Sequence, residues 1–466
     1  MPLLATAARA APRHVFAAAL AYAVTVLAVD VAPWLLPTLE RYFRFDPAAA
    51  RPVGTIAVVV TGVLYGALLG GALVLRRRTG RPLGILWCAA LWSVWEPLRT
   101  ALLPPHFPLS FLGTSQAAVL PMLQVASVTG IAGVTALVVA ANAALAQALL
   151  PASGRHRLAG ACAVAVVVLA AALWGGQRVA RMSASPPEGP RIVLVDGAAA
   201  AAGESTLERY LAATGSAAVG RAALVVWPES ALTLDLVQDA AAWRRLGAFV
   251  DELGVPLAAG GLGSAVTDGG RVAHFNSVHF MRPRHGMLSY HKRLLVPFAE
   301  AWPAALGAPP PAIEPVAAGR ALGVFGANGL RFGALICFEI TDAASVRALV
   351  GAGARLIVNV NNDVWFGTGV APQLVWARVR AVESGVPVAR ATNGGTSAVI
   401  DPAGRAVAAA RAAGRPAVLA SAIPEPVDTL YVRTGEVFLP ACLLVVLAGL
   451  RPARSRRVTA PPGTGG

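Results

Sequence analysis

Residues 331–340 read RFGALICFEI, and the organisation of the chain can be worked out from this stretch. Its apolar run predicts a strand through Leu335 and Ile336 that ends at Cys337. Taken alone, Cys337 is compatible with an inert core cysteine, because free cysteines are commonly buried. Its place where the strand gives way to a helix favours a reactive thiol, since a helix N-terminus stabilises a thiolate. Cys337 is therefore a candidate nucleophile.

A carboxylate stands at the end of a second predicted strand. Residues 224–231 read LVVWPESA, so Glu229 follows the apolar run Leu224–Val226 and a proline. At a strand end a carboxylate can face a cleft, where partial burial raises its pKa and suits it to act as a base. A solvent-exposed turn glutamate is the simpler interpretation of this segment alone, because loops carry many charges.

A lysine follows in residues 290–300, which read YHKRLLVPFAE. Lys292 is the single lysine in a chain of 466 residues that is otherwise rich in arginine. A compact ammonium can stabilise a developing oxyanion, and a planar guanidinium does not replace it. Chance survival of one lysine codon is the alternative. A base, a cation and a thiol at three strand ends together predict an acyl-transfer site.

Strands and helices alternate from Pro186 to the segment Pro424–Pro426, which predicts an α/β layered domain at 186–425. The strand candidates are Ile192–Val195, Leu224–Val226, Leu335–Ile336 and Leu356–Val360, and the helix candidates are 205–219, 235–253 and 372–384.

The rest of the chain has the composition of a membrane protein. The hydrophobic fraction is 56% and charged residues make up 14%, against about a quarter in soluble proteins. Apolar segments of membrane-spanning length lie at 15–37, 54–75, 120–149, 158–177 and 431–450, and a sixth, 82–103, is interrupted by Glu96, Pro97 and Arg99. The first segment continues past Asp30 without a small-residue cleavage site, so we expect a retained anchor.

Arginines flank these segments in a pattern that predicts their orientation. Six spans place four arginine clusters on one side: Arg9 and Arg13, Arg76–Arg78 and Arg81, Arg155 and Arg157, and Arg451, Arg454, Arg456 and Arg457. Because arginine-rich short loops stay in the cytoplasm, residues 178–430 are expected outside it. The same clustering accounts for the net charge of +15, so nucleic-acid binding is not expected.

The motifs, taken in order, resemble those of the nitrilase, or carbon–nitrogen hydrolase, superfamily. They are WPESA (227–231), YHKRLLVPFAE (290–300), ICFEI (336–340), NDVWFG (362–367), the run 377–405 and YVRTGE (431–436). WEPLR (95–99) and HFPLSFLGTSQ (106–116) narrow the resemblance to the apolipoprotein N-acyltransferase family. It covers about four-fifths of the chain.

The resemblance implies an αββα sandwich joined to a helical membrane bundle. It assigns Glu229 as general base, Lys292 as the group that stabilises the tetrahedral intermediate and Cys337 as nucleophile. It also assigns Glu300 and Glu339 as supporting carboxylates.

The resemblance also concerns Trp365, Phe338 and the N-terminal helices. Trp365 would lie on a mobile loop near the substrate entrance, although ordinary packing or an interfacial location suits a tryptophan as well. Phe338 stands where the family motif often has tyrosine. The family also has further N-terminal membrane helices, and this chain begins about two helices late.

The resemblance implies a ping-pong reaction through a thioester. A phospholipid would donate the acyl chain, and the N-terminal diacylglyceryl-cysteine of a lipoprotein would accept it, at the cell membrane. The alternatives are a membrane-anchored amidase or nitrilase acting on another C–N substrate, and a non-catalytic scaffold. No cofactor or metal is expected, because the histidines lack ligand spacing.

The predicted domains are a bundle of about five spans at 1–180, the catalytic domain at 186–425, a last helix with a basic tail at 426–457 and a disordered tail at 458–466.

Overall fold

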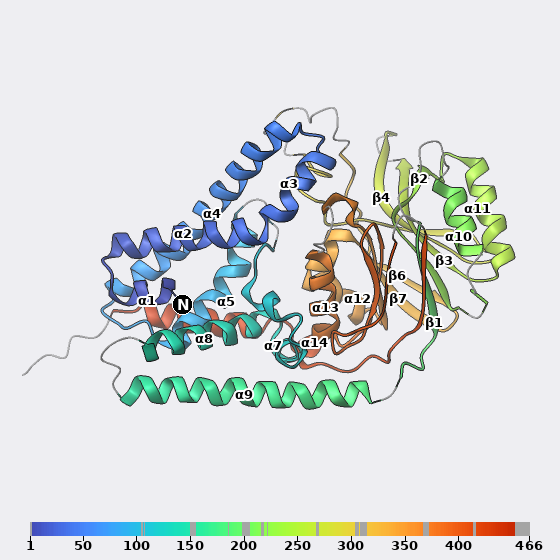
Figure 1. Cartoon of the computed structure of the whole chain (residues 1–466). Helices are drawn as coiled ribbons and strands as arrows, with labels where there is room; N and C mark the ends of the chain where they lie inside the picture. The colour runs from blue at the N-terminus through green and yellow to red at the C-terminus, as the bar shows by residue number, and fades with distance from the viewer. Residues whose placement is uncertain are drawn as a thin grey trace, which may run out of the picture.

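The computed structural model has a helical part and a β-sandwich part, which lie side by side in Figure 1. The predicted tail at 458–466 lies outside the described residues. The structure describes residues 2–452 apart from 104–105, 107, 150–154, 185, 198–205, 216–218, 221, 267–269, 303–306, 308–314, 367–371 and 413–415.

The described chain is mainly helical up to residue 183. Among the described helices, α2, α4, α8 and α9 are long and apolar enough to cross a membrane. The elements of this part are α1 (Pro2–Arg9), α2 (Pro12–Asp30), α3 (Ala32–Arg41), α4 (Pro47–Arg78), α5 (Ile85–Leu102), η1 (Leu112–Gln116), α6 (Leu120–Leu123), α7 (Ala126–Thr129), α8 (Ile131–Leu149) and α9 (Arg155–Ser183).

Two segments predicted as continuous spans are broken at glycines, so that prediction was wrong. The segment 120–149 divides into α6, α7 and α8, and Gly130 has a φ of 69°. The segment 431–450 divides into α14 (Leu430–Thr434) and α15 (Phe438–Leu450), and Gly435 also has a φ of 69°. Glycine adopts this left-handed conformation without a Cβ clash, so the chain can turn there.

The interrupted segment 82–103 forms the helix α5, whose charged residues are buried and paired. Glu96 accepts hydrogen bonds from the Leu112 amide and the Thr135 hydroxyl, both at 2.7 Å. The Arg99 guanidinium lies over the Tyr65 ring, 4.4 Å from its centroid. Buried charges persist where they are paired in this way, so the interruption does not end the helix.

One of the predicted arginine clusters, the one that contains Arg76 and Arg77, makes contacts at one end of the helical part. Arg77 donates a hydrogen bond to the Ala10 carbonyl, and Arg76 donates to the carbonyls of Gly449 and Pro82. These contacts join α4 to the chain before α2 and to the end of α15. In Figure 1 the N label marks this end of the helical part, away from the sandwich.

The described strands form two six-stranded sheets, ordered β12-β1-β2-β3-β4-β5 and β11-β10-β9-β8-β7-β6. In each sheet the central strands pair in parallel: β1 with β2 and β2 with β3 in the first sheet, and β7 with β8 and β8 with β9 in the second. The strands are β1 (Arg191–Asp196), β2 (Leu224–Asp235), β3 (Leu257–Val266), β4 (Val272–Met281), β5 (Met287–His291), β6 (Gly323–Ala327), β7 (Leu330–Ile336), β8 (Leu356–Asn362), β9 (Val388–Asn393), β10 (Thr396–Ile400), β11 (Ala406–Arg411) and β12 (Ala417–Ala422).

The sheets pack face to face, and helices cover their outer faces, which gives the predicted αββα order. Side chains such as Leu194, Val226 and Ile336 form the apolar core between the sheets. The helices α10 (Thr206–Gly215) and α11 (Ala240–Leu253) cover the first sheet. The helices α12 (Ala343–Gly351) and α13 (Pro372–Ser384) cover the second.

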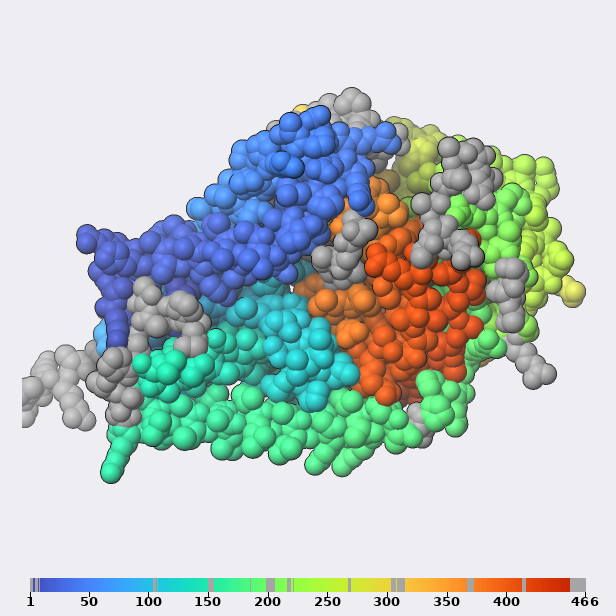
Figure 2. All heavy atoms as spheres, in the orientation of Figure 1, coloured from blue at the N-terminus to red at the C-terminus, as the bar shows by residue number. Residues whose placement is uncertain are grey.

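The helical part packs directly on the layer formed by α12 and α13. Leu123, Ala126 and Val134 belong to the same apolar cluster as Trp376 of α13. The Ile131 amide donates a 2.7 Å hydrogen bond to Glu383 of α13. Figure 2 shows the cyan residues of this region against the orange surface of the sandwich. The two parts therefore share a core.

Candidate active site

The three side chains predicted from separate strand ends lie together in one buried site. Glu229 is on β2, Lys292 follows β5, and Cys337 begins the 3-10 helix η3 (Cys337–Thr341) after β7. Lys292 Nζ lies 3.7 Å from Glu229 Oε1, and Cys337 lies within the electrostatic influence of both groups. The three residues are 5%, 1% and 8% exposed, so their charges interact with little screening by water.

The backbone is irregular at two of these positions. The pairing of β2 with β3 shifts between Trp227 and Leu232, and such a bulge re-aims the side chains within it, here including Glu229. Ser230 has a φ of 58° and Cys337 a φ of 51°. Side chains other than glycine rarely occupy this left-handed region, at a cost of about 1–3 kcal/mol. The fold therefore imposes these conformations beside the reactive groups.

Lys292 is held by a second carboxylate and an amide. Its Nζ lies 2.8 Å from both oxygens of Glu300. Asn276 Nδ2 donates to Glu229 Oε1 at 2.7 Å and to Glu300 Oε1 at 2.8 Å. The Val296 amide donates to Glu300 Oε2 at 2.8 Å. Glu300 was predicted as a supporting residue, whereas Asn276 was not predicted.

The pKa shifts follow from this arrangement. Burial raises the pKa of Glu229, and the Lys292 ammonium offsets the shift only in part. Burial alone would lower the pKa of Lys292, but the carboxylates of Glu300 and Glu229 outweigh burial and raise it. Burial likewise opposes ionisation of Glu300, yet Lys292 and its hydrogen bonds bring the pKa of Glu300 below its usual value. The site therefore holds a protonated lysine paired with an ionised Glu300.

The Cys337 group rests as a thiol. Burial, followed by the Glu229 carboxylate, raises the pKa of Cys337 well above its usual value. The predicted helix N-terminus is only the short 3-10 helix η3, and it does not overcome burial. Glu229 Oε2 is buried and receives no N–H or O–H hydrogen bond from the residues that the structure describes. This oxygen is therefore free to accept the thiol proton.

Glu339 joins the segments that carry Cys337 and Lys292. Its carboxylate accepts hydrogen bonds from the Ile336 amide at 2.8 Å and the Arg293 amide at 2.7 Å. The Tyr290 hydroxyl donates to the same carboxylate at 2.8 Å. Glu339 thus fixes the residues next to the reactive groups.

Trp365 lies in the 3-10 helix η4 (Asp363–Phe366), which contacts the helical part of the chain. Trp34, Thr38 and Tyr42 follow one another at intervals of four along one face of α3 and its C-terminal end. Trp34 packs edge-to-face on Phe366 with ring centroids 5.6 Å apart, and the Thr38 hydroxyl donates to the Trp365 carbonyl at 3.2 Å. The Tyr42 and Trp365 ring centroids are 3.7 Å apart.

Tyr42 therefore stands at the edge of the site, although it comes from the helical part. Burial, followed by the Glu300 carboxylate, raises the pKa of Tyr42 to about 12. Tyr42 was not predicted as a site residue. The four-residue spacing on α3 indicates a contact face, but not the partner of that face.

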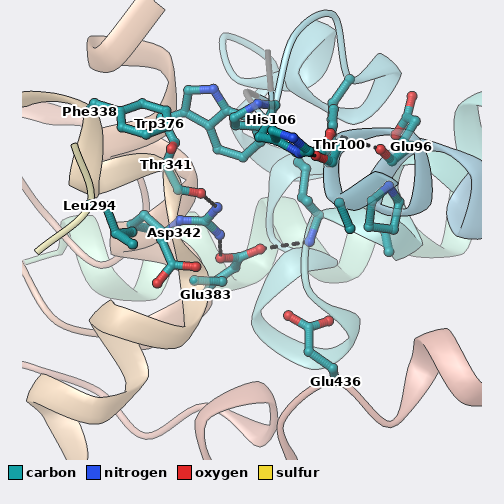
Figure 3. Close-up of a pocket in the computed structure, with 18 of the residues that line it drawn as sticks. Glu96, Thr100, His106, Leu294, Phe338, Thr341, Asp342, Trp376, Glu383 and Glu436 are labelled. Carbon is teal, nitrogen blue, oxygen red and sulfur yellow. Dashed lines mark hydrogen bonds and ion pairs between the residues drawn. The ribbon is translucent and has the colours of Figure 1, made fainter. Parts of the chain in front are cut away.

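Two cavities lie where the helical part meets the sandwich. One, of about 730 Å³, is lined by Glu96 and Thr100 of α5 and by Trp376 and Glu383 of α13, which face each other in Figure 3. Phe338, the neighbour of Cys337, also lines it. The second, of about 740 Å³, is lined by α2 residues, the 108–118 segment and Asp363. The reactive side chains themselves line neither cavity.

Comparisons with known proteins match both parts of the chain. The profile of the carbon-nitrogen hydrolase family matches residues 191–425, and that of the apolipoprotein N-acyltransferase N-terminal domain matches residues 1–144. The apolipoprotein N-acyltransferase of Bradyrhizobium diazoefficiens is 32% identical over 80% of this chain and 73% of its own length. The chain belongs to the apolipoprotein N-acyltransferase family.

Two further relatives and one solved structure extend the comparison. The proteins of the same name from Rhodopseudomonas palustris and Geobacter metallireducens are 32% and 28% identical, over 84% and 95% of this chain and 77% and 87% of their own lengths. An amidase from Nesterenkonia sp. has a solved structure with a TM-score of 0.41 and 20% identity, over 54% of this chain and 95% of the amidase.

Proposed function

We propose that this N-acyltransferase transfers an acyl chain from a phospholipid to the N-terminal amine of a diacylglyceryl-cysteine on a lipoprotein. The observation that carries the proposal is the buried contact of Cys337, Glu229 and Lys292 in a chain whose apolar helices share a core with the catalytic sandwich. One substrate is a phospholipid and the other is a lipid-anchored protein, so both must reach the thiol from a bilayer. A cavity between helices and sandwich, lined in part by Phe338 next to Cys337, supports such a route.

In the first half-reaction, Glu229 takes the proton of the Cys337 thiol as the sulfur attacks the ester carbonyl of the phospholipid. The C=O electron pair moves onto oxygen, and the Lys292 ammonium stabilises this oxyanion. When the intermediate collapses, the C–O bond breaks and Glu229 returns the proton to the departing oxygen. Lysophospholipid leaves, and the acyl chain stays on Cys337 as a thioester.

In the second half-reaction, the lipoprotein amine attacks the thioester carbonyl. Glu229 accepts a proton from the amine, Lys292 again stabilises the oxyanion, and the C–S bond breaks. The Cys337 sulfur then recovers its proton, and the amide product leaves. Glu300 orients Lys292, Glu339 fixes the flanking backbone, and Trp365 forms part of the entrance. This cycle uses only groups that lie in the site.

The proposed location is the cell membrane, with several spans and the sandwich outside the cytoplasm. The positive-inside rule supports this orientation, because Arg76 and Arg77 lie with the chain near Ala10 and Gly449 at one end of the helical part. We propose the boundaries 1–180 for the helical bundle, 186–425 for the catalytic domain and 426–457 for the last helix and tail.

Mass spectrometry of the purified protein after incubation with phospholipid tests the proposal. An acyl adduct should form on Cys337 and disappear when a diacylated lipopeptide is added, with N-acylated peptide as product. Cys337→Ala should form neither adduct nor product. Cys162→Ala is the matched control, because Cys162 is exposed on α9 and should not affect turnover. Acylation retained by Cys337→Ala would rule out the assigned nucleophile.

A further inference from the structure

Asn276 contacts three of the residues that surround the thiol: Glu229, Glu300 and Lys292. Its side-chain Nδ2 donates to Glu229 Oε1 at 2.7 Å and to Glu300 Oε1 at 2.8 Å, and its backbone carbonyl accepts a 2.8 Å hydrogen bond from the Lys292 amide. We infer that Asn276 is a positioning residue that holds Glu229 and Glu300 together as carboxylates around one lysine. The inference rests on the proposed function, in which Glu229 is the base.

The chemistry of the amide group suits this task. An amide nitrogen carries two hydrogens, so Asn276 can give one to each carboxylate. The reverse orientation would turn the amide oxygen toward two anionic oxygens, and this is repulsive. The two carboxylate oxygens thus lie within two hydrogen-bond lengths of each other, although they carry like charges. A neutral donor stabilises both ionised forms without adding a second cation to the site.

The Lys292 ammonium cannot stabilise both carboxylates alone. Lys292 Nζ is 2.8 Å from Glu300 and 3.7 Å from Glu229, so it pairs closely with one carboxylate only. For Glu229 Oε1, the shorter contact is with Asn276. Because Glu229 must be ionised to accept the thiol proton, Asn276 supports the active form of the base. Its second bond, to Glu300, fixes the partner that orients Lys292.

The pairing of strand β4 fixes the position of Asn276 and so of its side-chain amide. β4 pairs with β3 on one side, where Asn276 is opposite Leu262, and with β5 on the other. The next residue, Ser277, directs its hydroxyl to His291 Nδ1 at 2.8 Å instead of to the carboxylates. Alternation along the strand therefore separates the two neighbouring side chains, and Ser277 offers a matched control.

The test is the pH dependence of Cys337 acylation by phospholipid in full-length wild type, Asn276→Leu, Asn276→Asp and Ser277→Ala. Loss of the donor raises the pKa of Glu229 further, so the acidic limb of the Asn276→Leu rate profile should move up by about one pH unit. Asn276→Asp adds a third carboxylate and should move the limb further in the same direction. Ser277→Ala should keep the wild-type profile.

Alkylation of Cys337 by iodoacetamide, followed by mass spectrometry of the peptide, gives a readout that needs no lipid. The same ordering of acidic limbs is expected, because Glu229 must accept the thiol proton in this reaction too. A folded Asn276→Leu protein with wild-type limbs in both assays overturns the inference. A wild type that is alkylated but never acylated overturns the proposed function, while the alkylation profiles still decide the role of Asn276.

Discussion

Replacing Lys292 by methionine isolates the contribution of its charge. The side chain is 1% exposed and lies 2.8 Å from Glu300 and 3.7 Å from Glu229, so Lys292→Met leaves two buried carboxylates without their cation. Breaking a buried ion pair in this way costs about 3–5 kcal/mol of unfolding free energy. The variant can limit the loss by binding a proton. For a carboxyl group with an ordinary pKa of 4.5, binding this proton costs about 4 kcal/mol at pH 7.5 and about 1.4 kcal/mol at pH 5.5.

The stability difference between variant and wild type should therefore shrink on acidification. In the wild type the lowered pKa of Glu300 contributes stability above the unfolded value near 4.5, and this is lost as the pH falls. In Lys292→Met both carboxylates have raised pKa values, so acid relieves a penalty. Thermal unfolding in detergent should show a midpoint roughly 10 °C below wild type at pH 7.5 and only a few degrees below at pH 5.5.

Arg245→Met is the control for removing a cation. Arg245 pairs with Glu208 at 3.1 Å, but the two side chains are 50% and 54% exposed, and such surface pairs contribute little. Its midpoint should stay close to wild type at both pH values. A Lys292→Met protein with a pH-independent deficit, or with greater stability than wild type, would refute the electrostatic account of the site.

Three further predictions concern other contacts. Glu339→Gln places an NH₂ group against buried amide donors and should slow Cys337 acylation at least tenfold, measured as adduct formation; an unchanged rate would exclude its role in fixing the site. Asp363→Asn removes the buried counterion of Arg390, 2.6 Å away, and should lower the free energy of unfolding by about 3–5 kcal/mol in thermal melts, whereas a neutral effect would contradict the pairing. Gly130→Ala should be destabilising and lower the melting midpoint, because the φ is 69° and the Cβ would lie 2.7 Å from the Tyr431 ring; full stability would show that the turn can be rebuilt.

Local sequence patterns sufficed to predict an α/β layered domain and four of its strands, because these strands are short apolar runs, whereas the αββα sandwich was implied by the family resemblance. The predicted segments Ile192–Val195 and Leu356–Val360 lie inside β1 and β8, and 372–384 coincides with α13. Membrane helices were harder to delimit. The apolar composition of 120–149 masked the turn at Gly130, since hydropathy does not register a change of backbone conformation.

Glu229 and Cys337 could be found because each follows a recognisable strand, and Lys292 because it is the single lysine of the chain. Asn276 and Tyr42 come from segments without such a signal. Asn276 lies within the strand β4, and its contact with two carboxylates depends on how β4 pairs with β5. Residues 272–281 read VAHFNSVHFM, so polar Asn276 and Ser277 stand among apolar residues and two histidines, and no pattern singles out Asn276. Tyr42 is separated from Trp365 by most of the chain, so no local pattern could place them together.

The contact between α3 and Trp365 has a consequence for how the enzyme can be divided. A fragment limited to the sandwich would keep the thiol, the base and the lysine, but it would lack Trp34, Thr38 and Tyr42. Trp365 would then lose its edge-to-face contact with the Tyr42 ring. The surroundings of Trp365, which the proposed function places at the substrate entrance, are thus complete only when the apolar helical part is packed against the sandwich.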